Sequence, residues 1–206
     1  MPVLSASLDE ARENLRVIRQ TMDRSTKYST LSGLSGVLIG IVAIIGVLIT
    51  YKIHTREWFS VHSTVSPIAA VAAVWGSAMV LAIAIEFLAN KRRAARVGKH
   101  LASRLGAHII IAAIPGFLAG GVLTCFFALH GLIYYVWGIW MICYGLAICA
   151  VGLFSVRPVS MLGASFVTAG AITLLLPLGY HLPMMAVTFG GFHIIYGIAM
   201  ARRHGW

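Results

Sequence analysis

The chain has 206 residues, of which 59% are hydrophobic and 11% charged, and it carries a net charge of +10. This composition excludes a water-soluble globular domain and predicts an all-α protein whose main solvent is lipid. The basic excess does not indicate nucleic acid. We expect it to lie against anionic membrane lipids at a cytoplasmic face, where each Lys or Arg contributes roughly 1 kcal/mol of attraction.

Residues 1–30 predict a cytoplasmic amphipathic helix that precedes the membrane part. Ser7 and Glu10 have the spacing of a capping box at its start. One face of the helix is apolar, at spacings of three and four residues. Its members include Leu8, Leu15, Ile18 and Met22. Three interpretations stay open: this face lies on the lipid surface, packs on the cytoplasmic end of the bundle, or pairs with a protein partner or a second copy of the chain.

Residues 31–206 predict a bundle of six transmembrane helices. The apolar stretches lie at about Leu34–Tyr51, Ser66–Leu88, His108–Leu129, Ile133–Leu153, Ser160–Leu178 and Met184–Ala201. Each stretch is close to the ~20 residues that a helix needs to cross a ~30 Å hydrocarbon core.

The distribution of basic residues predicts the topology. Fourteen of the sixteen Lys and Arg residues fall on one side of the predicted spans, and only Lys52 and Arg56 fall on the other. Because loops rich in Lys and Arg stay in the cytoplasm, both termini are predicted to be cytoplasmic. Six spans are consistent with that arrangement.

The later spans contain an internal repeat. Residues 137–147 align without gaps on residues 189–199, and both segments carry an aromatic residue followed by Gly and then a Tyr-Gly pair. The alignment makes Tyr144 equivalent to Tyr196 and Gly138 equivalent to Gly190. We interpret the bundle as three parallel-repeated helical hairpins, the first of them diverged. The glycines predict close approach of helix backbones.

Few ionisable residues lie within the spans, and such residues are functional candidates because charge is costly in a bilayer. His193 lies near the middle of the sixth span, three residues before Tyr196. Glu86 is the one acidic residue in any predicted span, near its cytoplasmic end. For His193, three interpretations stay open: a hydrogen-bonded packing residue, a ligand or proton site together with Tyr196, Tyr144 and Glu86, or a haem ligand.

The sequence gives little support for a cofactor, a metal or catalysis. A b-type haem needs two axial ligands, and Met141, the repeat equivalent of His193, is the available companion. The outer loop carries His54, Glu57 and His62, which match zinc ligands in type, but no residue there enforces a closed site. One intramembrane acid cannot supply both an acid and a base, so we do not expect an enzyme.

Three segments resemble a group of uncharacterised bacterial integral membrane proteins, found mostly in acidobacteria. They are Asn14–Arg24, Phe154–Val159 and Gly190–Gly205. The resemblance implies a six-span protein of the bacterial inner (plasma) membrane and carries no assigned activity. This sequence departs from the group in its longer outer loop. The small-residue hairpins are also similar to those of the HdeD-type six-span acid-stress membrane proteins.

The leading hypothesis is a non-enzymatic accessory or regulatory subunit that presents its cytoplasmic helix and basic face to a protein partner. The alternative is a small carrier or proton-linked channel that uses His193, Tyr144 and Tyr196, and a third is a b-haem redox protein. The surroundings of His193 should discriminate between them. A dry, close-packed environment favours the subunit, and a polar cavity continuous with Pro115–Gly121 favours the carrier.

Overall fold

The structure is a computed structural model, and it describes residues 13–14, 33–55, 66–96 and 104–204. This described part of the chain is helical with short turns and contains no strand. Within it, six helices are long and apolar enough to cross a membrane, which confirms the all-α class and is compatible with a multi-pass membrane protein. The predicted partner face lies outside the described residues. Its members are Leu8, Leu15, Ile18 and Met22.

The six spans follow one another along the chain. The first five are α2 (Gly33–His54), α3 (Pro67–Arg96), α4 (Arg104–Leu129), α5 (Val136–Gly152), which follows the short turn η1 (Ile133–Tyr135), and α6 (Arg157–Leu175). The sixth is composite. After the turn η2 (Leu178–Tyr180) it consists of α7 (His181–Met185), the π-helix η3 (Ala186–Phe192) and α8 (His193–His204).

Two prolines have opposite effects on helix length. α6 ends at Leu175, although the sequence predicted a span to Leu178. Leu176 is extended, with φ -81° and ψ 158°, because the residue before a proline disfavours the helical region. Pro115, by contrast, lies inside α4, which continues through it. The third span is therefore unbroken, and the irregular helix is the sixth.

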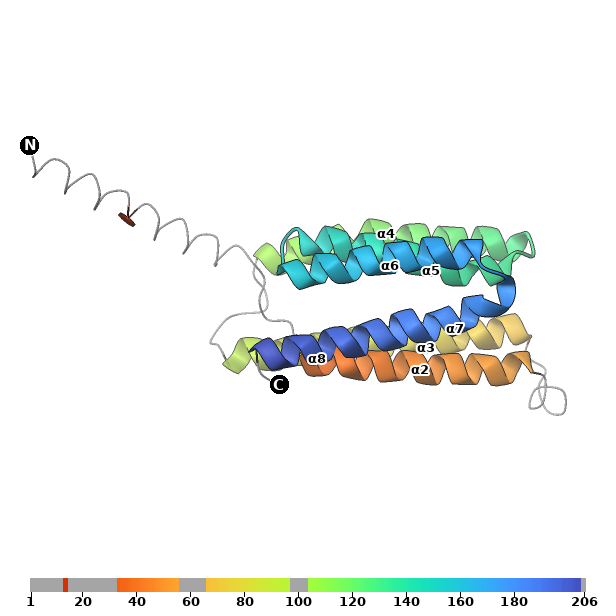
Figure 1. Cartoon of the computed structure of the whole chain (residues 1–206), viewed down its shortest axis with the longest axis horizontal. Coiled ribbons are helices and arrows are strands. Elements are labelled where there is room, and N and C mark those ends of the chain that lie inside the picture. The colour runs from red at the N-terminus through yellow and green to blue at the C-terminus, as the bar shows by residue number, and fades with distance from the viewer. Residues whose placement is uncertain (1–12, 15–32, 56–65, 97–103, 205–206) are drawn as a thin grey trace, which may run out of the picture.

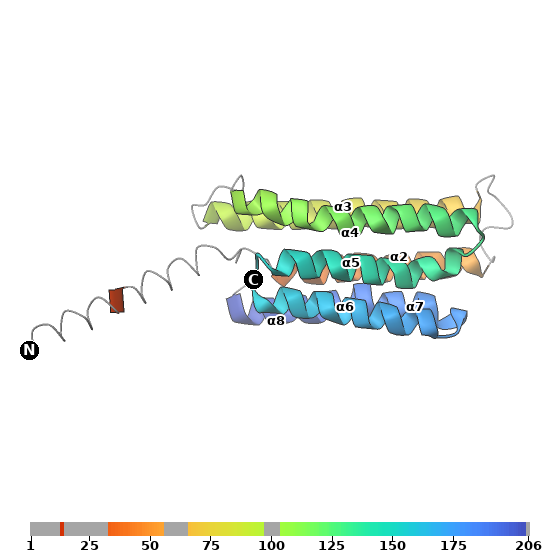
Figure 2. The same ribbon diagram turned by 90° about the horizontal axis from the view of Figure 1, so that it is seen from above.

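The spans form two layers (Figure 1), with α4, α5 and α6 in one and α2, α3 and the α7–α8 unit in the other. Seen from above, α5 lies in the middle of its layer and α2 in the middle of the other (Figure 2). We call the end of the bundle where α2 begins and α8 ends the proximal end. The opposite end, where α5 and α7 begin, is the distal end.

Glycines bring helix backbones into contact within each layer. On α5, a Cβ at Gly145 would lie 2.8 Å from the carbonyl oxygen of Gly163 on α6. On α8, a Cβ at Gly197 would lie 2.6 Å from both the carbonyl oxygen of Gly33 and the backbone nitrogen of Val37 on α2. Only a residue without a side chain permits such an approach, so these contacts fix which helices are neighbours.

The two glycines that the repeat makes equivalent, Gly138 and Gly190, lie between the same pairs of neighbouring helices. The carbonyl oxygen of Gly138 is 2.9 Å from the position that a Cβ would take at Gly170, and that of Gly190 is 2.6 Å from the corresponding position at Gly40. Gly138 thus lies between α5 and α6, and Gly190 lies between η3 and α2.

Two tryptophans are held by the same local arrangement in different helix pairs. Between α3 and α2, the indole N–H of Trp75 donates to the hydroxyl of Thr50 at 3.0 Å, and that hydroxyl donates to the Gly46 carbonyl at 2.8 Å. Between α5 and α4, Trp140 donates to Thr124 at 2.9 Å, and Thr124 donates to the carbonyl four residues earlier at 2.7 Å. Each arrangement satisfies an indole N–H away from water.

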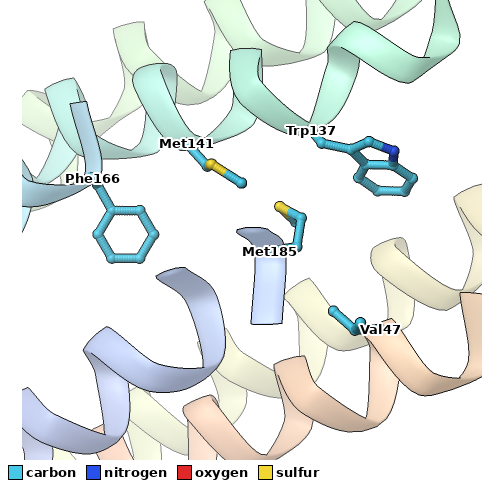
Figure 3. Packing of buried hydrophobic residues seen from close by; sticks show 5 residues of the cluster. All are labelled: Val47, Trp137, Met141, Phe166 and Met185. Atoms are coloured by element: carbon cyan, nitrogen blue, oxygen red, sulfur yellow. The ribbon is translucent and has the colours of Figure 1, made fainter. Parts of the chain in front are cut away.

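The core lies between the two layers and consists of large side chains. Trp137 and Met141 of α5 and Phe166 of α6 face Met185 of α7 and Val47 of α2 across it (Figure 3). The layers are therefore internally close at the backbone, and aromatic and sulfur-containing side chains fill the space between them.

The outer faces of α3 and α4 expose large aliphatic side chains. Val80 on α3 is 66% exposed and Leu118 on α4 is 63% exposed. Apolar surface of this extent is unfavourable in water and matches the hydrocarbon that would surround a spanning helix.

Candidate functional site around Glu86 and His193

The site begins with the irregular sixth span. The π-helix η3 ends at Phe192, and the backbone N–H of His193 donates to the Gly190 carbonyl. Single π-turns inside membrane and soluble helices are rare and concentrate at functional positions. Here the π-turns stand directly before the histidine that the sequence singled out, so they set the direction in which its ring points.

His193 faces inward and is hydrogen-bonded at both ring nitrogens. It is 5% exposed, with Nδ1 3.0 Å from the carbonyl oxygen of Phe189 and Nε2 2.7 Å from the hydroxyl oxygen of Tyr144 on α5. A carbonyl only accepts, so Nδ1 carries hydrogen and donates to Phe189. In the neutral ring, Nε2 then accepts from the Tyr144 hydroxyl. His193 is thus hydrogen-bonded to its own helix and to a hydroxyl on another span.

Aromatic rings close one side of this pair. The ring of Phe166, which has no exposed surface, lies 4.8 Å from that of Tyr144 and 5.3 Å from that of His193. The Phe189 ring lies 5.0 Å from that of Tyr144. On this side the environment is dry and close-packed, which is the condition under which His193 has a structural role.

Glu86 on α3 is held by polar neighbours from two helices. The amide nitrogen of Asn90, one turn further along α3, donates to Glu86 Oε1 at 3.0 Å. The hydroxyl of Ser35 on α2, which is 2% exposed, also bonds to the Glu86 side chain. Glu86 is half-buried, and its carboxylate is paired with side chains of its own helix and of a neighbouring one.

The four predicted ligand or proton residues lie in one neighbourhood. The charge of Glu86 acts on the hydroxyls of both Tyr144 and Tyr196, and these two tyrosines also interact electrostatically with each other. Tyr144 in turn bonds His193. We call this set, together with Ser35 and Asn90, the Glu86 cluster.

Two polar atoms of the cluster are buried without a hydrogen-bond partner. They are the hydroxyl oxygen of Tyr196 and Oδ1 of Asn90. Buried polar atoms are usually paired, so each unpaired one calls for an explanation. Both of these atoms lie in the same cluster as the single acidic side chain of the spans, where hydrogen-bond partners can change with protonation.

Sequence reasoning missed Ser35 and Asn90. Asn90 lies four residues after Glu86, which places the two side chains on one helix face, so this pair had a local signal. Ser35 had none, because its contact depends on the packing of α2 against α3 and α8. A Cβ at Gly36, the residue after Ser35, would lie 2.9 Å from the Cα of Gly197, the residue after Tyr196.

The geometry at His193 does not fit a haem with the ligand pair considered from the sequence. Both nitrogens of His193 are bonded to Phe189 and Tyr144. The sulfur of Met141 accepts from the Thr173 hydroxyl at 3.4 Å instead of facing the histidine across an open space.

The described residues also form a lateral groove of about 490 Å³ between α6 and the sixth span. Its lining includes Thr168, Ile172, Met184 and Phe192, and no residue of the Glu86 cluster belongs to it. This groove is therefore not the polar cavity, continuous with Pro115–Gly121, that would favour a carrier.

The chain matches no protein-family model, no curated protein and no solved structure.

Proposed function

We propose that this protein is a small proton-linked channel of the bacterial inner membrane, with the Glu86 cluster as its proton-binding site. The supporting observation is Glu86 itself. The single acidic residue of the spans is bonded by Asn90 and Ser35 inside the bundle and acts electrostatically on two tyrosines. An intramembrane carboxylate is costly, and in membrane proteins such groups commonly mark ion or proton pathways.

Close packing limits what can pass. Aromatic rings pack closely against one side of His193, which argues against a carrier that binds a small molecule on that side. A proton needs no cavity, because it moves between hydrogen-bonded groups. Of the two forms of the alternative hypothesis, we therefore propose the proton-linked channel and not the carrier.

The residues of the cluster have distinct roles in this proposal. Asn90 serves both states of Glu86, because rotation of its amide exchanges a donor for an acceptor. The Tyr144 hydroxyl is subject to the charge of Glu86 and donates to Nε2 of His193, so it transmits the protonation state of Glu86 to the imidazole, whose Nδ1 donates to Phe189.

The test is proton flux in liposomes that contain the purified protein under an imposed pH gradient. Glu86→Gln keeps the shape and the Asn90 contact but cannot release a proton, so we expect the flux to fall to that of empty liposomes. Glu13→Gln, at an exposed acid outside the spans, is the matched control and should retain the flux. Equal flux for the native protein and Glu86→Gln would overturn the proposal.

A second proposal is the accessory or regulatory subunit, with the face formed by Leu8, Leu15, Ile18 and Met22 as the contact. It is supported by the dry packing around His193 and by exposed basic side chains at the proximal end, where this helix would lie. These are Lys91, Arg92, Arg157 and Arg202. The expected partners are a membrane protein, a second copy of the chain, or anionic lipid. Loss of co-purified protein from native membranes in a Leu15→Glu, Ile18→Glu variant, with Glu86→Gln unaffected, would favour this role.

The same proposals include the finer architecture. We propose that the termini are cytoplasmic and that the bundle consists of three parallel-repeated hairpins. The matching Trp75–Thr50 and Trp140–Thr124 pairs support repetition of the first two hairpins. The equivalent contacts of Gly138 and Gly190 support repetition of the last two.

A further inference from the structure

A second histidine, at the distal end, has a different environment from His193. His181 is the first residue of α7 and has no exposed surface. Its Nδ1 lies 3.0 Å from the carbonyl oxygen of Tyr134 in η1, and its Nε2 lies 3.1 Å from the carbonyl oxygen of Leu176, just beyond α6. The ring therefore joins three elements: η1, the end of α6 and α7.

Both acceptors are carbonyl oxygens, and neither can donate. A neutral imidazole has one N–H, so it satisfies one carbonyl and turns a lone pair toward the other. The imidazolium has two N–H groups and satisfies both. His193 differs in this respect, because one of its partners is a hydroxyl that can donate to a neutral ring.

We propose that His181 is a second proton-binding site, charged when it bonds both carbonyls, and that it responds to the proton concentration at the distal end of the bundle. Histidine is the side chain that ordinarily changes charge near neutral pH, so the response is measured between pH 5 and pH 8. The inference goes beyond the proposed channel and does not depend on it.

The groups that face His181 can tune this response but cannot replace it. The Tyr135 ring of η1 lies 5.8 Å from it at an edge-on angle. Other titratable side chains of the adjoining elements at this end are Tyr134 of η1 and Tyr180 of η2. On α2 they are His54, whose ring lies 6.0 Å from that of Tyr134, Tyr51 and Lys52. Among the described residues of α2, α5, α6, α7, η1, η2 and η3 there is no carboxylate. The charge on His181 is therefore offset by carbonyl dipoles, whose arrangement depends on the fold.

The contact has a structural consequence. Tyr134 lies in η1, two residues before the start of α5, which carries Tyr144, and His181 begins the unit that carries His193. One imidazolium thus ties together the distal ends of the two segments that meet in the Tyr144–His193 bond. When the ring is deprotonated, one carbonyl loses its donor and this junction loosens, so the junction is tightest in acid and loosens as the pH rises.

The first test uses the unmodified full chain in nanodiscs. Hydrogen exchange of a peptide covering residues 176–185, corrected for the intrinsic effect of pH, should accelerate about ten- to hundredfold between pH 5 and pH 8, as loss of a hydrogen bond to a charged group implies. A peptide from the middle of α6 should show no such change. Equal corrected exchange at the two pH values would overturn the proposal.

The second test uses variants. The melting temperature of the native protein should fall as the pH rises from 5 to 8, and His181→Gln, which can donate but cannot be charged, should remove that dependence. His130→Gln is the matched control, because His130 is an exposed distal histidine bonded only within α4. If His181→Gln does not fold, the exchange experiment decides alone. A native-like pH dependence in His181→Gln would overturn the proposal.

Discussion

The hydroxyl of Tyr144 on α5 and Nε2 of His193 on α8 lie 2.7 Å apart and form a hydrogen bond between the two layers of the bundle. The two residues are 49 positions apart in the sequence. The repeat makes Tyr144 the equivalent of Tyr196, but the hydrogen bond of its hydroxyl is to His193.

Removing this hydroxyl should destabilise the protein. Tyr144→Phe leaves the neutral His193 ring with an acceptor that nothing satisfies, at a cost of roughly 1–3 kcal/mol in the free energy of unfolding. Chemical unfolding in detergent micelles measures this change. Tyr180→Phe, at an exposed tyrosine on η2, is the control and should cost much less. Equal costs at the two positions would show that the bond does not contribute to stability.

The contact between α2 and α8 should tolerate no side chain at Gly197. Because a Cβ there would lie 2.6 Å from backbone atoms that cannot rotate away, Gly197→Ala should cost roughly 1–3 kcal/mol. The control is Gly76→Ala on α3, where nothing lies within 4 Å of the added carbon. That change should be neutral or slightly stabilising, since Ala favours the helix. Thermal unfolding measures the effect of both variants. Equal shifts in their unfolding midpoints would contradict the packing described for Gly197.

The two Trp–Thr pairs should have similar energetic weight. Thr50→Val and Thr124→Val each preserve shape while removing the acceptor of a tryptophan N–H, and each should cost roughly 1–3 kcal/mol. Thr168→Val is the control, because its exposed hydroxyl bonds only the Ala164 carbonyl of its own helix. Unfolding followed by tryptophan fluorescence gives the comparison. A cost at only one of the two pairs would count against their equivalence in the repeat.

Single cysteines should report opposite sides of the membrane at the two ends of the bundle. In a cysteine-free background, Thr55→Cys at the distal end should react with an impermeant maleimide in intact cells. Lys91→Cys at the proximal end should react only after the cells are permeabilised, because the basic end stays in the cytoplasm. Labelling of both positions in intact cells would reject the proposed orientation.

The helical spans could be predicted from the sequence because the thickness of the hydrocarbon core sets a length that apolar runs must match. The π-helix could not be predicted. Its residues, Ala186–Phe192, differ little in composition from those of the regular α5, and the choice between the two helix types depends on packing against other spans. The predicted helix ends differ from the observed ones by a few residues. α6, for example, ends at Leu175 because Pro177 disfavours a helical conformation of the residue before it.

The candidate site was predictable in its members and not in its connections. His193, Tyr196 and Glu86 stand out because ionisable side chains are rare in the spans. Their neighbours do not stand out, since Ser35 is one of many small residues and its bond to Glu86 requires α2 and α3 to be adjacent. His181 was overlooked for a related reason: its two acceptors are backbone carbonyls, which no residue type reveals.

The contrast between the glycine contacts and the aromatic core has a mechanical consequence. Each layer is a stiff slab, because backbones in direct contact cannot slide without steric overlap, as at Gly145 and Gly197. The interface between the two layers, called the seam below, consists of aromatic rings and thioethers that can adopt new rotamers. Sliding of one layer past the other should therefore cost less energy than movement of helices within a layer. Both His193 and His181 bond across this seam. Two imidazoles therefore contribute to the resistance of this interface to shear, and a change in the protonation of either ring alters that contribution.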